Sequence, residues 1–269
     1  MSDFKKKKQY GQNFLTSPAI PSRIAAQSGC EGCGVIEIGP GLGILTNELL
    51  KTAAKVVAVE IDDELIPLLQ DKFAGTGLTI VHSDILECDI STLIKDNFGD
   101  MPVCVCANLP YYVTTPILMK LLEGDFGFKT ITVMVQREVA DRITAKKATS
   151  QNSALTVACS YYATVKKLFT VSAGSFSPPP KVNSAVIRFD MRQEPLAVSD
   201  KQKLFALIKA AYSQRRKTLS NSLMSCLPPD MTKDKLEQAI VAAGLKPTAR
   251  AEELDIFDFI KLTDVITNS

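Results

Sequence analysis

One stretch indicates the fold class: Val35-Ile36-Glu37-Ile38-Gly39-Pro40-Gly41-Leu42-Gly43. A short apolar strand runs into three glycines at alternate positions, and a helical pattern begins directly after them. Glycines permit a tight turn that a ligand can approach, and the start of a helix offers free N–H groups. The spacing is G-x-G-x-G instead of the dinucleotide-binding G-x-G-x-x-G, and Pro40 removes one amide from the turn. An ordinary tight turn remains the alternative.

Apolar strands alternate with amphipathic helices around this turn. The predicted strands span 35–38, 56–59, 78–81, 103–107 and 130–135, and the predicted helices span 45–54, 63–73, 92–97, 115–122 and 137–146. A helix ending near residue 27, a helix over 153–163 and two β segments, 165–171 and 184–191, complete this part. Such alternation predicts an α/β, Rossmann-like fold, in which a mostly parallel central sheet carries helices on both faces.

The pattern changes near residues 192–200. From Lys201 onward only helical periods occur, over 201–211, 219–225, 233–243 and 256–267. The sequence therefore predicts two domains: residues 1–196 form the α/β domain, and residues 197–269 form a small all-α C-terminal domain.

The composition is that of a globular protein with a sizeable core. Of its 269 residues 46% are hydrophobic, and no apolar run approaches the roughly 20 residues of a membrane-spanning helix. No apolar segment follows the four lysines at 5–8, so we expect no signal peptide and a cytoplasmic location. Seven cysteines lie within predicted strands and helices and are expected to be reduced. Cys30-x-x-Cys33 has zinc-ligand spacing, but with one histidine and no second such pair we expect no metal.

Positive charge is unevenly distributed although the net charge is only +2. Residues 201–229 carry six lysines and arginines and no acid, whereas residues 230–269 carry eight acids against five bases. Such asymmetry is typical of a surface that faces phosphates, and a solvated basic helix face is the alternative. The candidate phosphate contacts are Lys5 to Lys8, Arg142, Lys146, Lys147, Arg215, Arg216 and Lys217.

Two carboxylates follow the next strands of the predicted sheet. Glu60 ends the strand 56–59, 17 residues beyond Gly43, and Asp84 follows the strand 78–81. Beside the glycine turn, Glu60 could accept from two ribose hydroxyls and Asp84 from an adenine amino group. The glycine turn lacks the spacing of a pyrophosphate-binding turn. Together with Glu60 and Asp84 it therefore suits an adenosyl ligand without a pyrophosphate, namely S-adenosylmethionine. A surface ion pair for Glu60 and a helix cap for Asp84 are the alternatives.

The strand 103–107 ends in Asn108-Leu109-Pro110-Tyr111-Tyr112. Pro110 has no N–H and a fixed φ, so the chain leaves the sheet there. The Asn108 side-chain carbonyl, a backbone carbonyl near Pro110 and an aromatic ring would then converge at the strand's carboxyl end. Two acceptors and a stacking face suit a planar base with an amino group. An ordinary turn with packed tyrosines is the alternative.

Taken together, these motifs resemble those of the S-adenosylmethionine-dependent ribosomal RNA adenine N6-dimethyltransferases. The resemblance covers about residues 10–262 and rests on the segments 12–15, 37–43, 59–62, 84–86 and 108–111. Two further segments, 176–186 and 213–219, look like the small-subunit branch of that family. One departure is Tyr112-Val113-Thr114, where other members often have Asn-Ile-Ser.

The resemblance implies a function for individual residues. The implied ligands of S-adenosylmethionine are Asn13, Leu15, Gly39, Gly41, Glu60, Asp84 and Asn108, and the implied catalytic loop is Asn108, Leu109, Pro110 and Tyr111. The side-chain carbonyl of Asn108 and the backbone carbonyl of Pro110 would hold the adenine amine, while Tyr111 would stack on the base.

The implied substrate is a pair of adjacent adenosines in a hairpin near the 3′ end of small-subunit (16S) rRNA, each methylated twice. We expect the partner to be that rRNA within an assembling 30S-type subunit, with no membrane involved and the protein a monomer. The alternatives are a large-subunit rRNA adenine methyltransferase, a non-catalytic assembly factor and a nicotinamide-dependent oxidoreductase. Pro40 and the glycine spacing count against the last of these.

Overall fold

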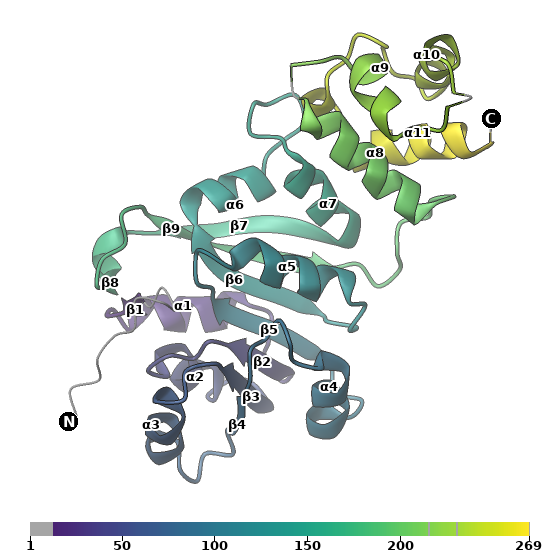
Figure 1. Cartoon of the computed structure of the whole chain (residues 1–269). Coiled ribbons are helices and arrows are strands. Elements are labelled where there is room, and N and C mark those ends of the chain that lie inside the picture. Colours follow the sequence, from purple (N-terminus) through teal and green to yellow (C-terminus); the bar gives the residue numbers. More distant parts are fainter. Residues whose placement is uncertain (1–12, 215, 230, 269) are drawn as a thin grey trace. The chain divides into compact units, whose positions relative to one another are not determined.

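The computed structural model describes residues 13–214, 216–229 and 231–268 (Figure 1). The chain divides into two compact units. The sheet unit comprises the described residues up to Ala140 together with Val165–Met191. The helical unit comprises Asp141–Thr164 and the described residues from Arg192 onward.

The sheet unit is built on a seven-stranded sheet with the order β4-β3-β2-β5-β6-β9-β7. Its strands are β2 (Gly34–Ile38), β3 (Lys55–Glu60), β4 (Thr79–His82), β5 (Val103–Asn108), β6 (Thr130–Gln136), β7 (Ala163–Val171) and β9 (Ser184–Met191). Strands β4, β3, β2, β5 and β6 are parallel, and β9 runs antiparallel to β6. The predicted mostly parallel sheet is confirmed.

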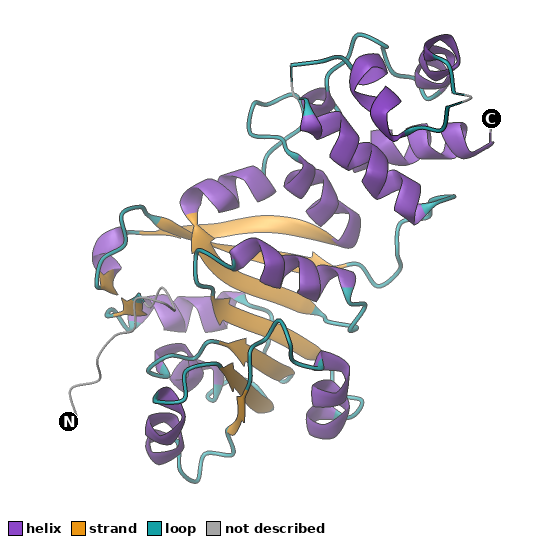
Figure 2. Ribbon diagram, viewed as in Figure 1, coloured by secondary structure: helices purple, strands orange, loops and turns teal. Residues whose placement is uncertain are grey.

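Helices lie on both sides of this sheet (Figure 2). They are α1 (Ala19–Gln27), α2 (Ile44–Leu49), α3 (Leu65–Lys72), α4 (Ile90–Phe98), α5 (Thr114–Glu123) and α6 (Arg137–Ile143). The covered faces explain the continuous apolar composition of the central strands, since every residue of β2 is buried and only the last residue of β5 is partly exposed.

The strand order reverses between β2 and β5. From β2 the chain proceeds outward through β3 to β4, and it then returns to β5 on the other side of β2. Open α/β sheets bind ligands at such a reversal, beyond the carboxyl ends of the strands. Ile38 pairs with both Val59 and Ala107, so Gly39, Glu60 and Asn108 come at one level of the same sheet edge.

A small two-stranded sheet joins distant parts of this unit. In β1 (Phe14–Leu15) and β8 (Phe176–Ser177), Phe14 pairs with Ser177 and Leu15 with Phe176 in antiparallel register. Thr16 extends the pairing, because its N–H donates to the Ser175 carbonyl at 2.9 Å and its hydroxyl donates to the same oxygen at 3.1 Å. The sequence did not predict this pairing.

The helical unit contains α7 (Ala154–Tyr162), α8 (Lys201–Ser213), α9 (Leu219–Ser222), α10 (Lys233–Ala242) and α11 (Ile256–Asn268). Its core is apolar and includes Leu204, Leu236 and Phe259, each fully buried. Residues 141–164 belong to this compact unit, whereas the sequence grouped them with the first domain. The reason is packing, because Val157 and Tyr161 of α7 are buried in that helical core.

No helix in the described part of the chain combines the length and the hydropathy needed to cross a membrane. All seven cysteines lie in that part, and none of them forms a disulfide.

Candidate active site

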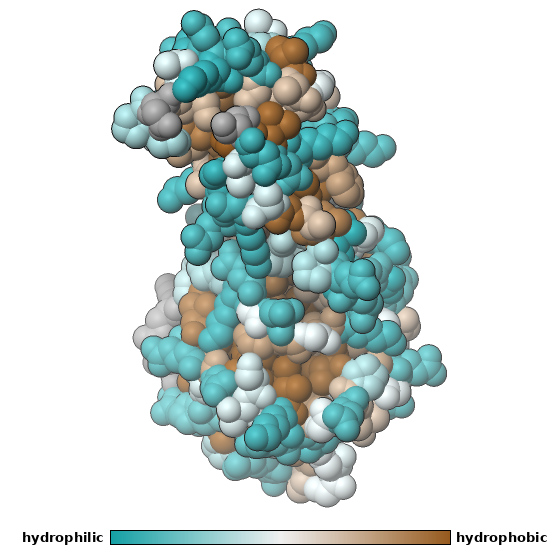
Figure 3. Space-filling view, turned by 90° about the vertical axis from the view of Figure 1, so that its right-hand side faces the viewer, coloured by the Kyte–Doolittle hydropathy of each residue, from teal (hydrophilic) through white to brown (hydrophobic). Residues whose placement is uncertain are grey.

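A cavity of about 310 Å³ lies at the carboxyl ends of β2, β3 and β5. Figure 3 faces the other, amino-terminal ends of the strands, where hydrophobic surface also gathers on the sheet unit among hydrophilic side chains. Ten predicted site residues line the cavity: Asn13, Leu15, Gly39, Gly41, Glu60, Asp84, Asn108, Leu109, Pro110 and Tyr111. The structure therefore brings the predicted cofactor ligands and the predicted catalytic loop to one place.

The glycine turn is tied to Glu60. The Gly41 N–H donates to Glu60 Oε2 at 3.2 Å, and the N–H groups of Ile61 and Asp62 both donate to Oε1 at 2.9 Å. Burial raises the pKa of the Glu60 carboxyl, which is only 4% exposed. A carboxylate has about four acceptor sites, so these three amides leave about one for a ligand. Glu60 thus shapes the turn as well as facing the cavity.

The turn itself requires glycine at Gly41. Its φ is +58°, which is in the left-handed region, and a Cβ there would lie 3.0 Å from Cε1 of Phe14. Phe14 is the first residue of β1, so β1 packs directly against the turn.

Asp84 is held in a turn of its own after β4. Its Oδ1 accepts from the Leu86 N–H at 2.8 Å, an arrangement that fixes the carboxylate relative to the backbone. Within the described residues no donor bonds the other oxygen, Oδ2. Asp84 therefore retains an acceptor beside the cavity, as the proposed contact with an adenine amino group requires.

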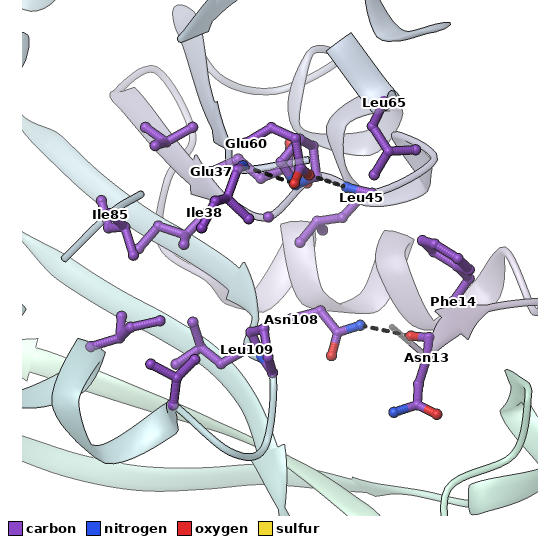
Figure 4. A pocket seen from close by; sticks show the side chains of 18 of the residues that line it. Asn13, Phe14, Glu37, Ile38, Leu45, Glu60, Leu65, Ile85, Asn108 and Leu109 are labelled. Carbon is purple, nitrogen blue, oxygen red and sulfur yellow. Dashed lines mark hydrogen bonds between the residues drawn. The ribbon is translucent and has the colours of Figure 1, made fainter. Parts of the chain in front are cut away.

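The amide of Asn108 has a defined orientation. Its Nδ2 donates to the backbone carbonyl of Asn13 at 3.3 Å (Figure 4). Because the nitrogen is used in this way, the side-chain oxygen Oδ1 is the group left to accept from a ligand in the cavity. The sequence predicted this role for Oδ1 but could not identify the partner that orients it.

The structure does not favour the Pro110 carbonyl as an acceptor for the substrate amine. That oxygen accepts from the Thr114 hydroxyl at 2.9 Å and from the Val113 N–H at 3.3 Å. Both of its lone pairs are therefore used by the first turn of α5. The carbonyl of Leu109, one residue closer to Asn108, receives no hydrogen bond from the described residues and is the alternative backbone acceptor.

Tyr111 lines the cavity as a half-buried side chain. Its hydroxyl and that of Ser184, the first residue of β9, are 2.6 Å apart. Burial raises the pKa of Tyr111, so the phenol is neutral at physiological pH. Tyr112 also lines the cavity but is 64% exposed.

Glu37 is a site residue that the sequence analysis did not assign. It lies in β2, lines the cavity and is 1% exposed, and its Oε2 has no hydrogen-bond partner among the described residues. Burial raises its pKa to about 8. The available signal was an acid inside an otherwise apolar strand. A buried acid with an unpaired oxygen next to a cavity fits a cationic ligand, and S-adenosylmethionine carries an ammonium and a sulfonium.

The predicted phosphate contacts separate into two groups. Exposed cations are found at Arg142, Lys146, Arg216 and Lys217, all in the helical unit. Lys147 is exposed as well, and it forms ion pairs with Asp255 at 3.0 Å and Asp258 at 3.3 Å, whose carboxylates raise its pKa. Its charge is neutralised within the helical unit. Arg215 and the lysines at 5–8 lie outside the described residues.

The sequence matches the ribosomal RNA adenine dimethylase family over residues 3–267. The chain belongs to this family. Membership confirms the resemblance that the motifs indicated and excludes the nicotinamide-dependent alternative. The protein is an S-adenosylmethionine-dependent rRNA adenine dimethyltransferase.

Two relatives match nearly the whole chain. The ribosomal RNA small subunit methyltransferase A of Shouchella clausii is 44% identical over 267 residues, which cover 98% of this chain and 90% of the relative. The protein of the same name from Streptococcus mutans is 45% identical over 265 residues, with coverages of 97% and 91%.

Two solved structures share the fold. A dimethyladenosine transferase from Plasmodium falciparum has a TM-score of 0.79 at 25% identity and covers 93% of this chain and 95% of its own. The 23S rRNA methyltransferase ErmE has a TM-score of 0.72 at 25% identity, with coverages of 95% and 100%. The predicted Rossmann-like methyltransferase fold is confirmed.

Proposed function

We propose that the protein dimethylates, at N6, two adjacent adenosines in a hairpin near the 3′ end of small-subunit rRNA. The observation that carries this proposal is the oriented Asn108 amide, whose Oδ1 is left as an acceptor in a cavity that Glu60 and Asp84 also line. Relatives named for the small subunit are 44% and 45% identical, whereas the large-subunit enzyme ErmE is 25% identical. This difference favours the small subunit over the large one.

The chemistry follows from the two acceptors beside the cavity. The lone pair of adenine N6 is delocalised into the ring, so the amine is a poor nucleophile. If Asn108 Oδ1 and the Leu109 carbonyl accept its two N–H bonds, they orient the nitrogen and stabilise the positive charge that develops on it. S-adenosylmethionine supplies an activated methyl group. The protein thus contributes position and electrostatics, and no general base is assigned.

The ligand set for the cofactor is divided among strand ends. Gly39 and Gly41 allow close approach of the backbone, Glu60 offers its remaining acceptor to the ribose, and Asp84 Oδ2 accepts from the adenine amino group. Asn13, directly before β1, and Leu15, the last residue of β1, also line the cavity. A cationic group of the ligand beside Glu37 would pair with the buried Oε2, which has no hydrogen-bond partner among the described residues.

Tyr111 stacks on the target base after the base leaves its helix. Extrusion of a base costs a few kcal/mol, and an aromatic stacking partner contributes about 1–3 kcal/mol toward it. A half-buried ring on the cavity wall can receive such a base.

The helical unit would bind the RNA. Arg142, Lys146, Arg216 and Lys217 are its exposed candidates for phosphate contacts, which set register and not sequence. The sheet unit would carry out the methyl transfer, and the helical unit, which includes residues 141–164, would make the rRNA contact. The protein would act as a cytoplasmic monomer on an assembling 30S-type subunit.

The test is methyl transfer onto isolated small-subunit particles that lack the modification, followed by mapping of the modified bases. We expect two neighbouring N6,N6-dimethyladenosines near the 3′ end of the small-subunit rRNA and none on large-subunit particles. Modification of large-subunit rRNA instead would mean that the protein is a large-subunit rRNA adenine methyltransferase. Binding of small-subunit particles without methyl transfer would favour an assembly factor.

A further inference from the structure

Ser184 is hydrogen-bonded to Tyr111, which lines the cavity, although no motif assigned Ser184 a function. It opens β9, pairs in register with Gln136 of β6 and is fully buried. Its hydroxyl meets the Tyr111 hydroxyl at 2.6 Å, a short distance even for an O–H···O bond. A buried hydroxyl must find a partner, and for Ser184 that partner is the phenol of the residue proposed to stack on the substrate.

The two ends of this hydrogen bond differ in rigidity. Ser184 begins an interior strand, and the preceding Asn183 is fixed on both sides: its carbonyl accepts from Arg137 N–H at 2.9 Å and its side-chain oxygen accepts from Ala173 N–H at 3.1 Å. Tyr111 instead lies in the turn between β5 and α5. A ring in a turn is free to rotate about its side-chain torsions unless something holds its far end.

We propose that Ser184 is a positioning residue that holds the far end of the Tyr111 ring at the place where the ring stacks on the extruded adenine. The inference rests on the proposed stacking function of Tyr111. The bond is neutral at both ends and either hydroxyl can donate, so it fixes the ring without placing a charge near the amine. The segment 176–186 then has two functions beside the cavity. It pairs with β1 through β8, and it holds the Tyr111 ring through Ser184.

The test is a double-mutant cycle on the rate of the first methyl transfer under single-turnover conditions. We expect Ser184→Ala and Tyr111→Phe each to lower that rate by about three- to tenfold, the worth of one neutral hydrogen bond. The double variant should be no slower than the slower single variant, because both changes remove the same bond. The dissociation constant of S-adenosylmethionine should stay unchanged in all three.

A matched control is Ser28→Ala. Ser28 is equally buried and its hydroxyl donates to the Ala25 carbonyl at 2.7 Å, but it lies before β2, at the amino ends of the strands. This variant should lose stability without slowing methyl transfer. If Ser184→Ala fails to fold, Tyr111→Phe still removes the hydrogen bond, because Tyr111 is only half-buried and its change disturbs the core less. A wild-type rate in Tyr111→Phe overturns the proposal. Rates that multiply in the double variant overturn it as well.

Tyr111→Ala separates this inference from the proposed function. If Tyr111→Ala transfers methyl groups as fast as the wild type, Tyr111 does not stack on the base and the proposed function loses that part. If Tyr111→Ala is at least about a hundredfold slower while Ser184→Ala and Tyr111→Phe match the wild type, stacking stands and the positioning function of Ser184 is wrong.

Discussion

Asn108 is the residue on which the proposed chemistry depends most. Its nitrogen is used by the Asn13 carbonyl, so its oxygen remains for the substrate amine. Acceptors and donors that act on developing charge are worth about a hundredfold to a thousandfold in turnover when removed.

We therefore expect Asn108→Ala to lower kcat by about a hundredfold or more while the dissociation constant of S-adenosylmethionine rises by less than about tenfold. Calorimetric titration with the cofactor and single-turnover methyl transfer measure the two quantities. Asn97→Ala is the control, because Asn97 Nδ2 donates within α4 to the Leu93 carbonyl. Equal losses of turnover and affinity would mean that Asn108 is only a cofactor ligand.

Glu37 gives a pH dependence to the stability of the ligand-free protein. Its folded-state pKa is about 8 against an ordinary value of 4.5, because burial and the nearby Glu60 favour the neutral acid while Lys72 opposes them. The folded state therefore binds more protons than the unfolded state between these values. The contribution of Glu37 to stability should be fully present below about pH 4.5 and should be lost as the pH rises toward 8.

Glu37→Gln removes the titrating group while keeping its size. We expect the decline in unfolding temperature between pH 5 and pH 8 to become shallower in this variant, since the amide has no charge to bury. Thermal unfolding across that range measures it. An unchanged slope would assign the decline to other groups.

Residues at strand ends were predictable because the carboxyl ends of parallel strands meet at one edge, which is how Glu60, Asp84 and Asn108 were found. The hydrogen bonds of Pro110 could not be predicted in the same way. Its carbonyl is used by Thr114 and Val113 in the first turn of α5, and spacing alone does not reveal which of two neighbouring carbonyls a helix start takes up. Ser184 was missed because its partner lies 73 positions away.

At the scale of elements, the glycine turn between β2 and α2 combines a backbone requirement with a packing requirement. A left-handed conformation alone costs a residue with a Cβ about 1–2 kcal/mol. A Cβ added at Gly41 would also lie too close to Phe14 of β1. A Cβ added at Gly75, whose φ is +77°, would have nothing within 4 Å.

Gly75→Ala and Gly41→Ala are thus matched variants that differ in contact. We expect Gly75→Ala to lower the free energy of unfolding by about 1–2 kcal/mol and Gly41→Ala to lower it further. Only Gly41→Ala should weaken S-adenosylmethionine binding, because it displaces β1 beside the cavity. Urea unfolding and cofactor titration measure both. Equal effects of the two changes would contradict the packing argument.

The sequence predicted the alternation of helices and strands well because each element buries a periodic apolar face. It did not predict β1 and β8, since each is two residues long and neither has a period of its own. It also grouped α7 with the first domain, because the partners of Val157 and Tyr161 in the helical core come from much later in the chain.

At the scale of the whole molecule, binding of RNA should depend on salt. Each exposed cation that contacts a phosphate releases counterions, so its loss makes the plot of log affinity against log salt shallower by about one unit. We expect Lys217→Ala and Arg216→Ala each to show this change in small-subunit rRNA binding, with cofactor affinity unaltered. Lys147→Ala is the control, because Asp255 and Asp258 already neutralise Lys147. A slope that none of these variants changes would count against the helical unit as the RNA contact.

The pairing of β1 with β8 has a consequence for synthesis of the chain. Translation proceeds from the N-terminus, and a nascent chain that has emerged as far as β6 already contains the glycine turn, Glu60, Asp84 and Asn108. It lacks Phe176 and Ser184, so β1 has no pairing strand and the Tyr111 hydroxyl has no hydrogen bond to Ser184. We therefore expect an incomplete translation product that ends before residue 176 to contain all ten predicted residues that line the cavity and yet to be inactive.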